Sequence, residues 1–304
     1  MVQIMSDYHQ PVLLKETIES LVTKSNGIYI DVTYGGGGHS KEILKKLDAN
    51  GRLIVFDQDG EAEGNIIEDE RMTFVKSNFR HLYRFWKWID IDQVDGVFAD
   101  LGVSSHQFDA DYRGFSYRFD AELDMRMNES MKLSARDILA TYSIDELQSI
   151  FSRYGEIRNS KSLARAIVEN RNKGLYIIST KELNKILDRL KIGNYNKYFA
   201  QVYQALRMEV NDEMQSLQEM LTSSLRILKP AGRLVVISYH SLEDRMVKRF
   251  VKSGNADGTV DRDAYGRSLA KMKVGSKIIE PTQEEQRINA RSRSAKMRIG
   301  IRIE

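Results

Sequence analysis

The feature that most constrains this chain is a run of four glycines between a predicted strand and a predicted helix. An apolar strand is predicted over 28–31, glycines follow at 35–38, and a helical pattern covers 40–47. Glycines tolerate positive φ and let backbone N–H groups and the start of a helix approach a bound molecule. The pattern predicts a small ligand at this turn. A flexible surface turn is the alternative, because glycine motifs are weak without context.

A second apolar strand, over 52–56, supplies that context. It ends in Asp57, about 20 residues beyond Gly38, where an acidic side chain can accept hydrogen bonds from ribose hydroxyls. The run lacks the third glycine of a dinucleotide-binding fingerprint, and the sequence has no Gly-Lys-Ser/Thr phosphate loop. Asp31, just before the glycines, is expected to face the pocket, repel a pyrophosphate and attract a cation. S-adenosylmethionine, which carries an ammonium and a sulfonium, therefore fits better than a nicotinamide dinucleotide.

Composition narrows the class of protein further. The 304 residues include no cysteine, which excludes disulfides and thiolate metal sites. The five histidines are far apart and form no His-x-x-x-His pair, so no metal site is predicted. The sequence shows neither a signal pattern nor an apolar run of the ~20 residues needed to span a membrane, and we expect a cytoplasmic protein. A net charge of +3 permits a nucleic-acid partner without requiring one.

Strands and helices alternate through the first hundred residues. Further strands are predicted over 72–76 and 94–101, with an aromatic helix over 79–88. Its rings are expected to pack in the core or in a pocket wall, with a base-stacking platform as the alternative. A first helix is predicted over 9–22, led by Pro11. This alternation predicts an α/β fold with a parallel, doubly wound, Rossmann-like sheet. Ligands of such sheets bind beyond the C-terminal ends of the strands.

The pattern changes between residues 109 and 205. An irregular polar and aromatic segment is followed by four helical periods, over 134–141, 144–154, 160–170 and 180–190. This length far exceeds an ordinary crossover connection. We therefore predict that residues 1–108 and 206–304 form the cofactor-binding core and that residues 109–205 form an inserted helical domain.

The sheet pattern resumes after the insertion. A periodic helix over 211–228 is expected to stop at Pro230 and Gly232, and a buried strand follows over 233–238. The tail, 289–304, reads as a basic loop that leads into an alternating strand at a sheet edge. Four cations occur there within eight residues, and we expect them to contact RNA phosphates: Arg291, Arg293, Lys296 and Arg298.

Seven blocks of the sequence, taken in order, resemble one protein family. They include Asp-Val-Thr-Tyr-Gly-Gly-Gly-Gly-His at 31–39 and Asp-Leu-Gly-Val-Ser-Ser-His-Gln at 100–107. The others lie at 9–13, 113–117 with 123–127, 203–207 with 210–211, 232–245 and 289–295. The chain is similar to the MraW, or RsmH, family of ribosomal small-subunit RNA cytosine-N4 methyltransferases. Of its departures from the family pattern, His106, where the family usually has proline, is the one that could affect the chemistry.

This resemblance implies a class I methyltransferase sheet with an inserted helical domain, and S-adenosylmethionine as the cofactor. The substrate it implies is N4 of a cytidine in 16S ribosomal RNA of the small subunit, recognised with help from the helical domain. The cofactor contacts it implies are Gly37, Gly38, His39, Asp57, Phe79, Asp100 and Gln107.

The chemistry at a cytosine amine requires positioning more than a strong base, because the amine can lose its proton after methyl transfer. Asp100, which ends the fourth predicted strand, is the first candidate for contacting the amine or the cofactor. Ser104 and Ser105 are candidate helpers, with capping of the turn as the alternative. His240, after the fifth strand, is expected either to approach the base or to hydrogen bond the turn.

Two further groups of residues are candidates near the RNA. Tyr112, Phe115 and Tyr117 are expected either to stack on an extruded base or to pack between domains. Asp124 and Arg126 are expected to form an ion pair that shapes the pocket.

Three other functions remain open from the sequence. The chain could methylate another RNA or a small molecule, or it could be a non-catalytic RNA-binding assembly factor that retains the cofactor pocket. The third is a nicotinamide-dependent dehydrogenase, against which the missing third glycine and Asp31 both count. The sequence also leaves open whether the chain forms a homodimer.

Overall fold

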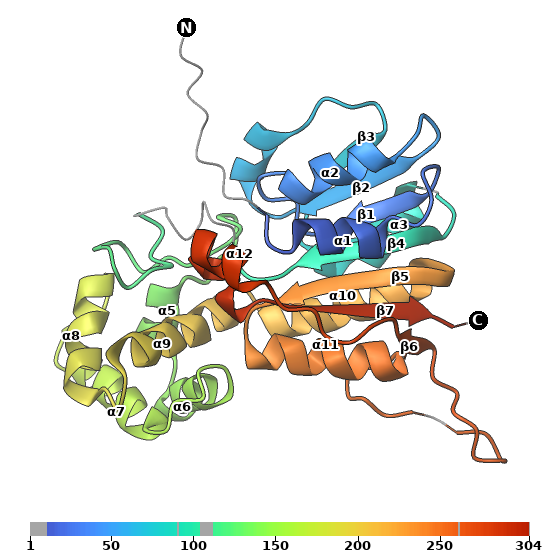
Figure 1. The fold of residues 1–304 in the computed structure, drawn as a ribbon. Helices are drawn as coiled ribbons and strands as arrows, with labels where there is room; N and C mark the ends of the chain where they lie inside the picture. Colours follow the sequence, from blue (N-terminus) through green and yellow to red (C-terminus); the bar gives the residue numbers. More distant parts are fainter. Residues whose placement is uncertain (1–10, 90, 104–111, 261, 304) are drawn as a thin grey trace, which may run out of the picture. The chain divides into compact units, whose positions relative to one another are not determined.

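The computed structural model describes residues 11–89, 91–103, 112–260 and 262–303 (Figure 1). The chain divides into two compact units. One consists of Met1–Gly102 and Met214–Glu304, and the other of Val103–Glu213. The helical insertion predicted over 109–205 lies within the second unit.

The first unit contains a seven-stranded sheet with the order β3-β2-β1-β4-β5-β7-β6. The first five strands in this order pair in parallel, and β7 is antiparallel to both β5 and β6. The chain starts at the centre, moves to one edge and then crosses to the other, which is the doubly wound arrangement predicted from the sequence. The strands are β1 (Ile28–Asp31), β2 (Arg52–Asp57), β3 (Met72–Lys76), β4 (Val94–Asp100), β5 (Leu228–Ser238), β6 (Met272–Val274) and β7 (Lys296–Arg302).

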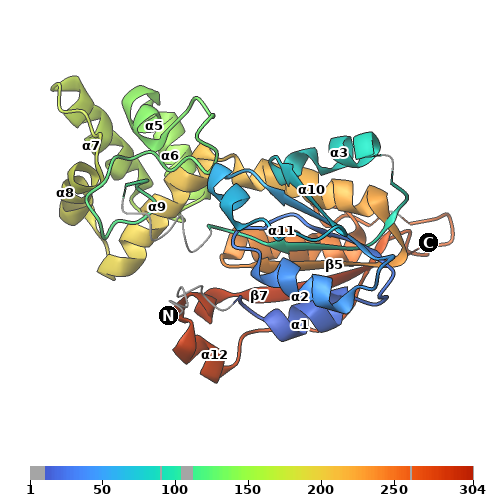
Figure 2. The ribbon, with the colours of Figure 1, turned by 90° about the horizontal axis from the view of Figure 1, so that it is seen from above.

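Helices cover both faces of this sheet because its central strands are apolar on both sides. Alternate residues of one strand enter different cores: Ile54 and Phe56 of β2 pack with α3, α10 and α11, and Leu53 and Val55 pack with α1 and α2. Figure 2 shows α3 and α10 on one side of the sheet and α1 and α2 on the other. The helices are α1 (Leu14–Leu21), α2 (Gly38–Lys46), α3 (Leu82–Ile89), α10 (Glu213–Ile227), α11 (Ser241–Ser253) and α12 (Gln283–Ile288). Short 3-10 helices are η1 (Gly60–Asn65), η2 (Phe79–His81) and η3 (Ala290–Ser294).

The second unit is built from helices around its own core. Three of them begin with capping boxes, in which the side chain of Ser134, Ser143 or Ser179 accepts a hydrogen bond from a backbone N–H three residues on. The helices are α5 (Ala135–Thr141), α6 (Ile144–Arg153), α7 (Ser160–Asn172), α8 (Thr180–Leu190) and α9 (Tyr195–Val210). In neither unit does the described chain contain a helix long and apolar enough to cross a membrane.

Several predicted boundaries were wrong for identifiable reasons. The helix predicted from residue 9 begins at Leu14, because Leu13 has a left-handed backbone with φ of 51° and Pro11 lies before it. Strand β5 begins at Leu228 rather than 233. It passes through Pro230 with a register shift against β4, so the proline sits at an irregularity of the sheet. The helix predicted to stop before Pro230 does end there, at Ile227.

Three α-helices and one strand were missed altogether: α9, α11, α12 and the short strand β6. The presence of β6 changes the position of the tail strand. Because β7 lies between β5 and β6, it is not the sheet edge that the sequence predicted.

Candidate active site

The glycine turn between β1 and α2 depends on the absence of side chains. Gly35 and Gly37 have φ values of 52° and 74°, in the left-handed region that glycine adopts without strain. A Cβ atom on Gly37 would lie 2.7 Å from the hydroxyl of Tyr34, and one on Gly38 would lie 2.4 Å from Cγ of Pro11. Close packing and positive φ therefore both require glycine here, and α2 begins directly at Gly38.

Hydrogen bonds to the Asp31 side chain hold this turn in place. Its carboxylate accepts hydrogen bonds from the Ser40 hydroxyl, at 2.6 Å, and from the Thr33 backbone N–H, at 3.0 Å. Burial raises the pKa of Asp31 to about 6, and these two hydrogen bonds oppose that rise. The sequence placed Asp31 facing the pocket, but its side chain is buried and joins the end of β1 to the first turn of α2.

Asp57 connects the end of β2 to the same turn. One of its carboxylate oxygens accepts the Gly35 N–H at 2.7 Å, and the other accepts the Asp59 N–H at 2.9 Å. Burial raises the pKa of Asp57, and these bonds oppose the rise. Each oxygen retains a second acceptor site, so the geometry leaves room for the predicted hydrogen bonds to ribose.

Phe79 lies beyond the end of the neighbouring strand β3. It opens the 3-10 helix η2, and its ring is partly buried against the sheet core. Next to it the Asn78 amide donates a 2.7 Å hydrogen bond to the Gln58 side chain, which follows Asp57. The ends of β2 and β3 thus present a carboxylate, two amides and an aromatic ring at one edge of the sheet.

Asp100 ends β4, the central strand between β1 and β5. Its backbone N–H donates to the Thr33 hydroxyl at 2.7 Å, and its Oδ1 accepts a 2.8 Å hydrogen bond from the Tyr239 hydroxyl. Burial raises the pKa of Asp100 to about 7; the bond from Tyr239 opposes this rise, and the charges of Asp31 and Glu243 add to it. About a quarter of the side chain remains exposed.

His39 lies beside Asp100 in the first turn of α2. Its Nε2 lies 3.0 Å from the Val12 carbonyl oxygen, and its Nδ1 lies 4.0 Å from Asp100 Oδ2. Burial lowers the pKa of His39 to about 4, so the ring is neutral at pH 7. A neutral ring that donates from Nε2 to Val12 presents the Nδ1 lone pair toward Asp100.

The charge of Asp31 raises the pKa of Asp100, so these two carboxyl groups lie close to one another. In the part of the chain that the structure describes, neither forms an ion pair with a lysine or an arginine. His39 does not compensate for them because it is neutral. This uncompensated acidity beside the glycine turn suits a cationic ligand.

Tyr239 was missed by the sequence analysis. It follows β5, whose Ile237 is in register with Asp100 of β4. The signal was an aromatic residue directly after a buried strand, which by itself did not reveal its partner.

His240, the next residue, caps α11. Its Nδ1 accepts the Glu243 backbone N–H at 3.4 Å, and its Nε2 lies 3.0 Å from Glu243 Oε1. Glu243 in turn accepts the Tyr239 N–H at 3.0 Å. Of the two interpretations of His240, the structure contains the hydrogen bonds to the turn; a catalytic role stays a prediction.

Comparison with known proteins identifies the family of this chain. The model of the MraW methylase family matches residues 6–303. The chain belongs to this family. The family predicted from the seven sequence blocks is therefore confirmed.

Individual members of the MraW family are close in sequence. A "Ribosomal RNA small subunit methyltransferase H" from Flavobacterium johnsoniae is 52% identical over 298 residues, which is 98% of each chain. A protein of the same name from Parabacteroides distasonis is 50% identical over 307 residues, again 98% of each. The crystal structure of a rRNA methylase from Streptococcus thermophilus covers 96% of this chain and 94% of its own, at 10% identity and a TM-score of 0.40, which is too distant to bear on function.

The remaining predicted site residues of this MraW-family chain differ in whether the structure describes them and in how exposed they are. Ser104, Ser105, His106 and Gln107 lie outside the described residues. Tyr112 is 56% exposed. Phe115, in contrast, is only 5% exposed and belongs to the hydrophobic core of the helical unit, so we withdraw it as a base-stacking residue.

The ion pair predicted between Asp124 and Arg126 is confirmed, with a distance of 2.6 Å between Arg126 Nη2 and Asp124 Oδ2. Arg126 also donates hydrogen bonds to the carbonyl oxygens of Glu129 and Met131. This pair therefore organises the irregular segment before α5.

The four cations predicted to contact RNA in the tail differ in their exposure and in their partners. Arg298 forms a two-pronged pair with Asp244 of α11, at 2.6 and 3.0 Å, and we withdraw it as an RNA contact. Arg293 is exposed on η3. Arg291 and Lys296 are half-buried.

Proposed function

We propose that this chain transfers the methyl group of S-adenosylmethionine to N4 of a cytidine in 16S ribosomal RNA of the small subunit. The observation that carries the proposal is the position of Asp100, whose carboxyl group ends the central strand β4 next to the glycine turn and is held by Tyr239. Ligands of doubly wound sheets bind at this edge. The names of the two MraW-family relatives support small-subunit ribosomal RNA as the target.

The residues at this edge fit the cofactor. S-adenosylmethionine supplies an electrophilic methyl group on a positively charged sulfur. Asp31 and Asp100 provide negative charge that no described lysine or arginine offsets. Asp57 retains acceptor sites for ribose hydroxyls, and the left-handed backbone at Gly35 and Gly37 shapes the turn that precedes α2.

Phe79 forms part of the wall beyond β3. Gly38, His39 and Gln107 complete the cofactor contacts that we propose. Of these, His39 contacts the Val12 carbonyl oxygen through Nε2 and faces Asp100 with Nδ1, so we propose that it forms part of the wall beside Asp100.

Asp100 acts on the acceptor by orienting it. The lone pair of the cytosine amine is delocalised into the ring, and a hydrogen bond from N4–H to the carboxylate favours the pyramidal nitrogen of the transition state. Thr33 fixes the backbone of Asp100, and the Tyr239 hydroxyl fixes its Oδ1, so that Oδ2 remains for the amine. A nearby positive charge favours ionised Asp100, and this carboxylate can receive the proton released after transfer.

Ser104, Ser105 and His240 are secondary candidates for the catalytic site. Tyr112, together with Arg291 and Arg293, is a candidate for RNA contact, and we propose that the helical unit takes part in recognition. Tyr112 supports this because more than half of its surface is exposed on that unit.

The test uses mass spectrometry of 16S RNA from cells that lack the gene, supplied with wild-type protein, Asp100→Asn or Asp92→Asn. Asn keeps the shape of Asp100 but does not carry its charge, and Asp92 is an exposed aspartate that serves as the control. We expect N4-methylcytidine to disappear on deletion and to return with the wild type and Asp92→Asn only.

Two other results would each select an alternative. A mark that never changes on deletion rejects the ribosomal target and leaves another RNA or a small molecule as substrate. Recovery of subunit assembly by Asp100→Asn without any methylation identifies an assembly factor.

A further inference from the structure

Helix α3 (Leu82–Ile89) has two sides of different character. Leu82 is fully buried, and Phe85 packs partly buried against the sheet, with its ring edge-to-face on Phe56 at 5.9 Å. The sequence favoured the core or a pocket wall, over a base-stacking platform, for the aromatic rings of this segment. Trp88 contradicts this prediction, because 80% of its surface is exposed.

The outer side of α3 is also basic. His81, Arg84 and Lys87 are exposed beside Trp88. Within the described ranges neither Arg84 nor Lys87 forms an ion pair, and the nearby Glu219 is engaged by Arg80 at 2.9 Å. An exposed indole among unpaired cations contributes little to folding, and such groups are typical of a binding surface.

Aromatic packing holds part of this surface in place. The ring of Tyr83 stacks on Trp86 with centroids 5.5 Å apart, and it lies beneath two cations, Lys87 at 4.8 Å and Arg226 of α10 at 5.1 Å. Cations over an aromatic ring are positioned without a carboxylate that would neutralise them. A shallow hollow opens beside them, lined by Ser77, His81, Arg84, Phe85, Lys87 and Trp88.

We propose that this outer side of α3, which we call the α3 face (His81, Arg84, Lys87 and Trp88), binds RNA. Arg84 and Lys87 provide charge for phosphates, and the indole of Trp88 provides a surface on which an unpaired base stacks. The positive charge favours a polyanion over a protein partner, because Trp88 is the single exposed large apolar side chain of the described part of this helix. The inference rests on the proposed function in one respect: the RNA is the 16S substrate.

The Trp88 end of the α3 face points away from the candidate active site, whereas His81 lies two residues from Phe79 of the proposed cofactor site. Asp100 lies at the C-terminal end of β4, whereas α3 runs from the end of β3 back toward the beginning of β4. Trp88, near the end of α3, therefore lies toward the N-terminal ends of the parallel strands, opposite the end at which Asp100 lies. The α3 face binds substrate without contacting the reacting atoms, so its loss weakens RNA binding and leaves the maximal rate unchanged.

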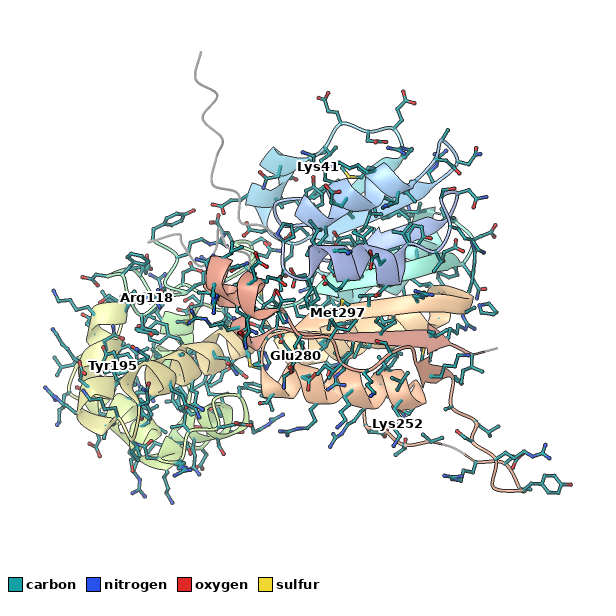
Figure 3. The ribbon with its side chains drawn as sticks, in the orientation of Figure 1. Lys41, Arg118, Tyr195, Lys252, Glu280 and Met297 are labelled. Carbon is teal, nitrogen blue, oxygen red and sulfur yellow. The ribbon has the colours of Figure 1, made fainter. Side chains whose placement is uncertain are left out.

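The experiment compares purified full-length wild type with Arg84→Ala/Lys87→Ala and with Lys248→Ala/Lys252→Ala. The second pair removes two exposed cations of the same unit from α11, where Lys252 extends away from the helix (Figure 3). Affinity for 16S RNA is measured at several salt concentrations. We expect Arg84→Ala/Lys87→Ala to weaken binding about tenfold and to reduce the salt slope by about 1.5, the value for two phosphates. The control pair should change affinity less than about threefold.

Substitution of Trp88 tests the stacking. Trp88→Ala should weaken binding roughly tenfold, and Trp88→Phe, which keeps a flat ring, should retain most of the affinity. Both should keep the wild-type kcat at saturating RNA.

Three results would overturn the inference. The first is a wild-type protein that methylates the RNA while the α3 variants bind it as tightly as the α11 control; this leaves the proposed function intact. The second is a sedimentation coefficient that differs between the wild type and the α3 variants in the absence of RNA. That difference would make the α3 face a contact between two copies of the chain. The third is a wild-type protein that neither binds nor methylates 16S RNA, which rejects the proposed function as well.

Discussion

The hydroxyl of Tyr239 donates a 2.8 Å hydrogen bond to Oδ1 of Asp100. The two residues are separated by 139 positions in the chain, and they meet because β4 and β5 are neighbours in the sheet. The bond opposes the effect of burial on the Asp100 carboxyl, since it stabilises the ionised form.

Substitution of Tyr239 by phenylalanine should therefore raise the pKa of Asp100 above about 7. A hydrogen bond to a charged group contributes about 1.5 kcal/mol, which corresponds to about one pH unit. We expect the acid limb of the kcat/KM profile for 16S RNA methylation to move by about that amount toward higher pH. Activity near pH 9 should change little.

Tyr142→Phe is the matched control. It removes another tyrosine-carboxylate bond, the 2.9 Å contact with Glu209 in the helical unit. Its profile should stay in place. A Tyr239→Phe enzyme that is slower by the same factor at every pH would show that the tyrosine acts by packing alone.

The free energy of unfolding should also depend on the protonation state of the Asp100 carboxyl group. The pKa of Asp100 rises from 3.8 to about 7 on folding, so the unfolded chain releases this proton first as the pH increases. Asp100 then contributes stability that is present below pH 3.8 and is lost as the pH rises to about 7. Asp100→Asn removes this dependence. Its unfolding free energy relative to wild type should grow between pH 4.5 and 8, by roughly 3 kcal/mol.

Urea unfolding at pH 4.5, 6 and 8 measures this difference. Asp69→Asn is the control, because pairing with Arg71 lowers the pKa of Asp69 to about 2 and leaves it ionised throughout this range. The effect of Asp69→Asn should be independent of pH. A flat difference for Asp100→Asn as well would contradict a raised Asp100 pKa.

The glycine turn should tolerate alanine poorly at Gly37. Alanine there has an unfavourable φ of 74° and places Cβ 2.7 Å from the Tyr34 hydroxyl, which is itself hydrogen bonded to the Asn65 carbonyl. We expect a loss of about 2 kcal/mol or more in unfolding free energy. Gly266→Ala, with φ of 79° and open space, should lose about 1 kcal/mol, and Gly64→Ala should be nearly neutral.

Calorimetry of S-adenosylmethionine binding extends this test. Gly37→Ala should bind the cofactor weakly even where it remains folded, and Gly266→Ala and Gly64→Ala should bind it normally. Normal cofactor affinity in folded Gly37→Ala would remove the glycine turn from the proposed cofactor site.

Two arginines of the tail should respond differently to substitution by alanine. Arg298 is largely buried and paired with Asp244, so its loss leaves a carboxylate without its partner. Arg298→Ala should lower the unfolding free energy by about 2–3 kcal/mol. Arg293→Ala should leave stability within about 0.5 kcal/mol and instead reduce the salt slope of RNA binding by about 0.7–0.9. A destabilised Arg293→Ala, or a stable Arg298→Ala with weak RNA binding, would reverse the two assignments.

The sequence by itself determined the first half of the sheet and the family. Strands β1 to β4 occur where buried apolar runs predicted them, since a parallel strand covered on both faces contains few polar residues. The glycine turn, Asp57 and Asp100 lie at the ends of these strands because the pattern of strand and turn is local. The order of seven motifs was enough to identify the MraW family.

Only the tertiary structure decided which side chains are partners and which are exposed. The sequence treated Arg293 and Arg298 as equivalent cations, but β7 places Arg298 next to Asp244. It grouped Phe115 with Tyr112, and the core of the helical unit buried one of them and left the other exposed.

The Tyr239 bond to Asp100 and the exposure of Trp88 depend in the same way on segments that the chain brings together only after folding. Hydrophobic periodicity predicts which residues leave water. Strand order and helix packing set the neighbours that these residues meet. The hydrophobic effect is non-directional and does not select particular partners, whereas hydrogen bonds and ion pairs require groups at defined positions.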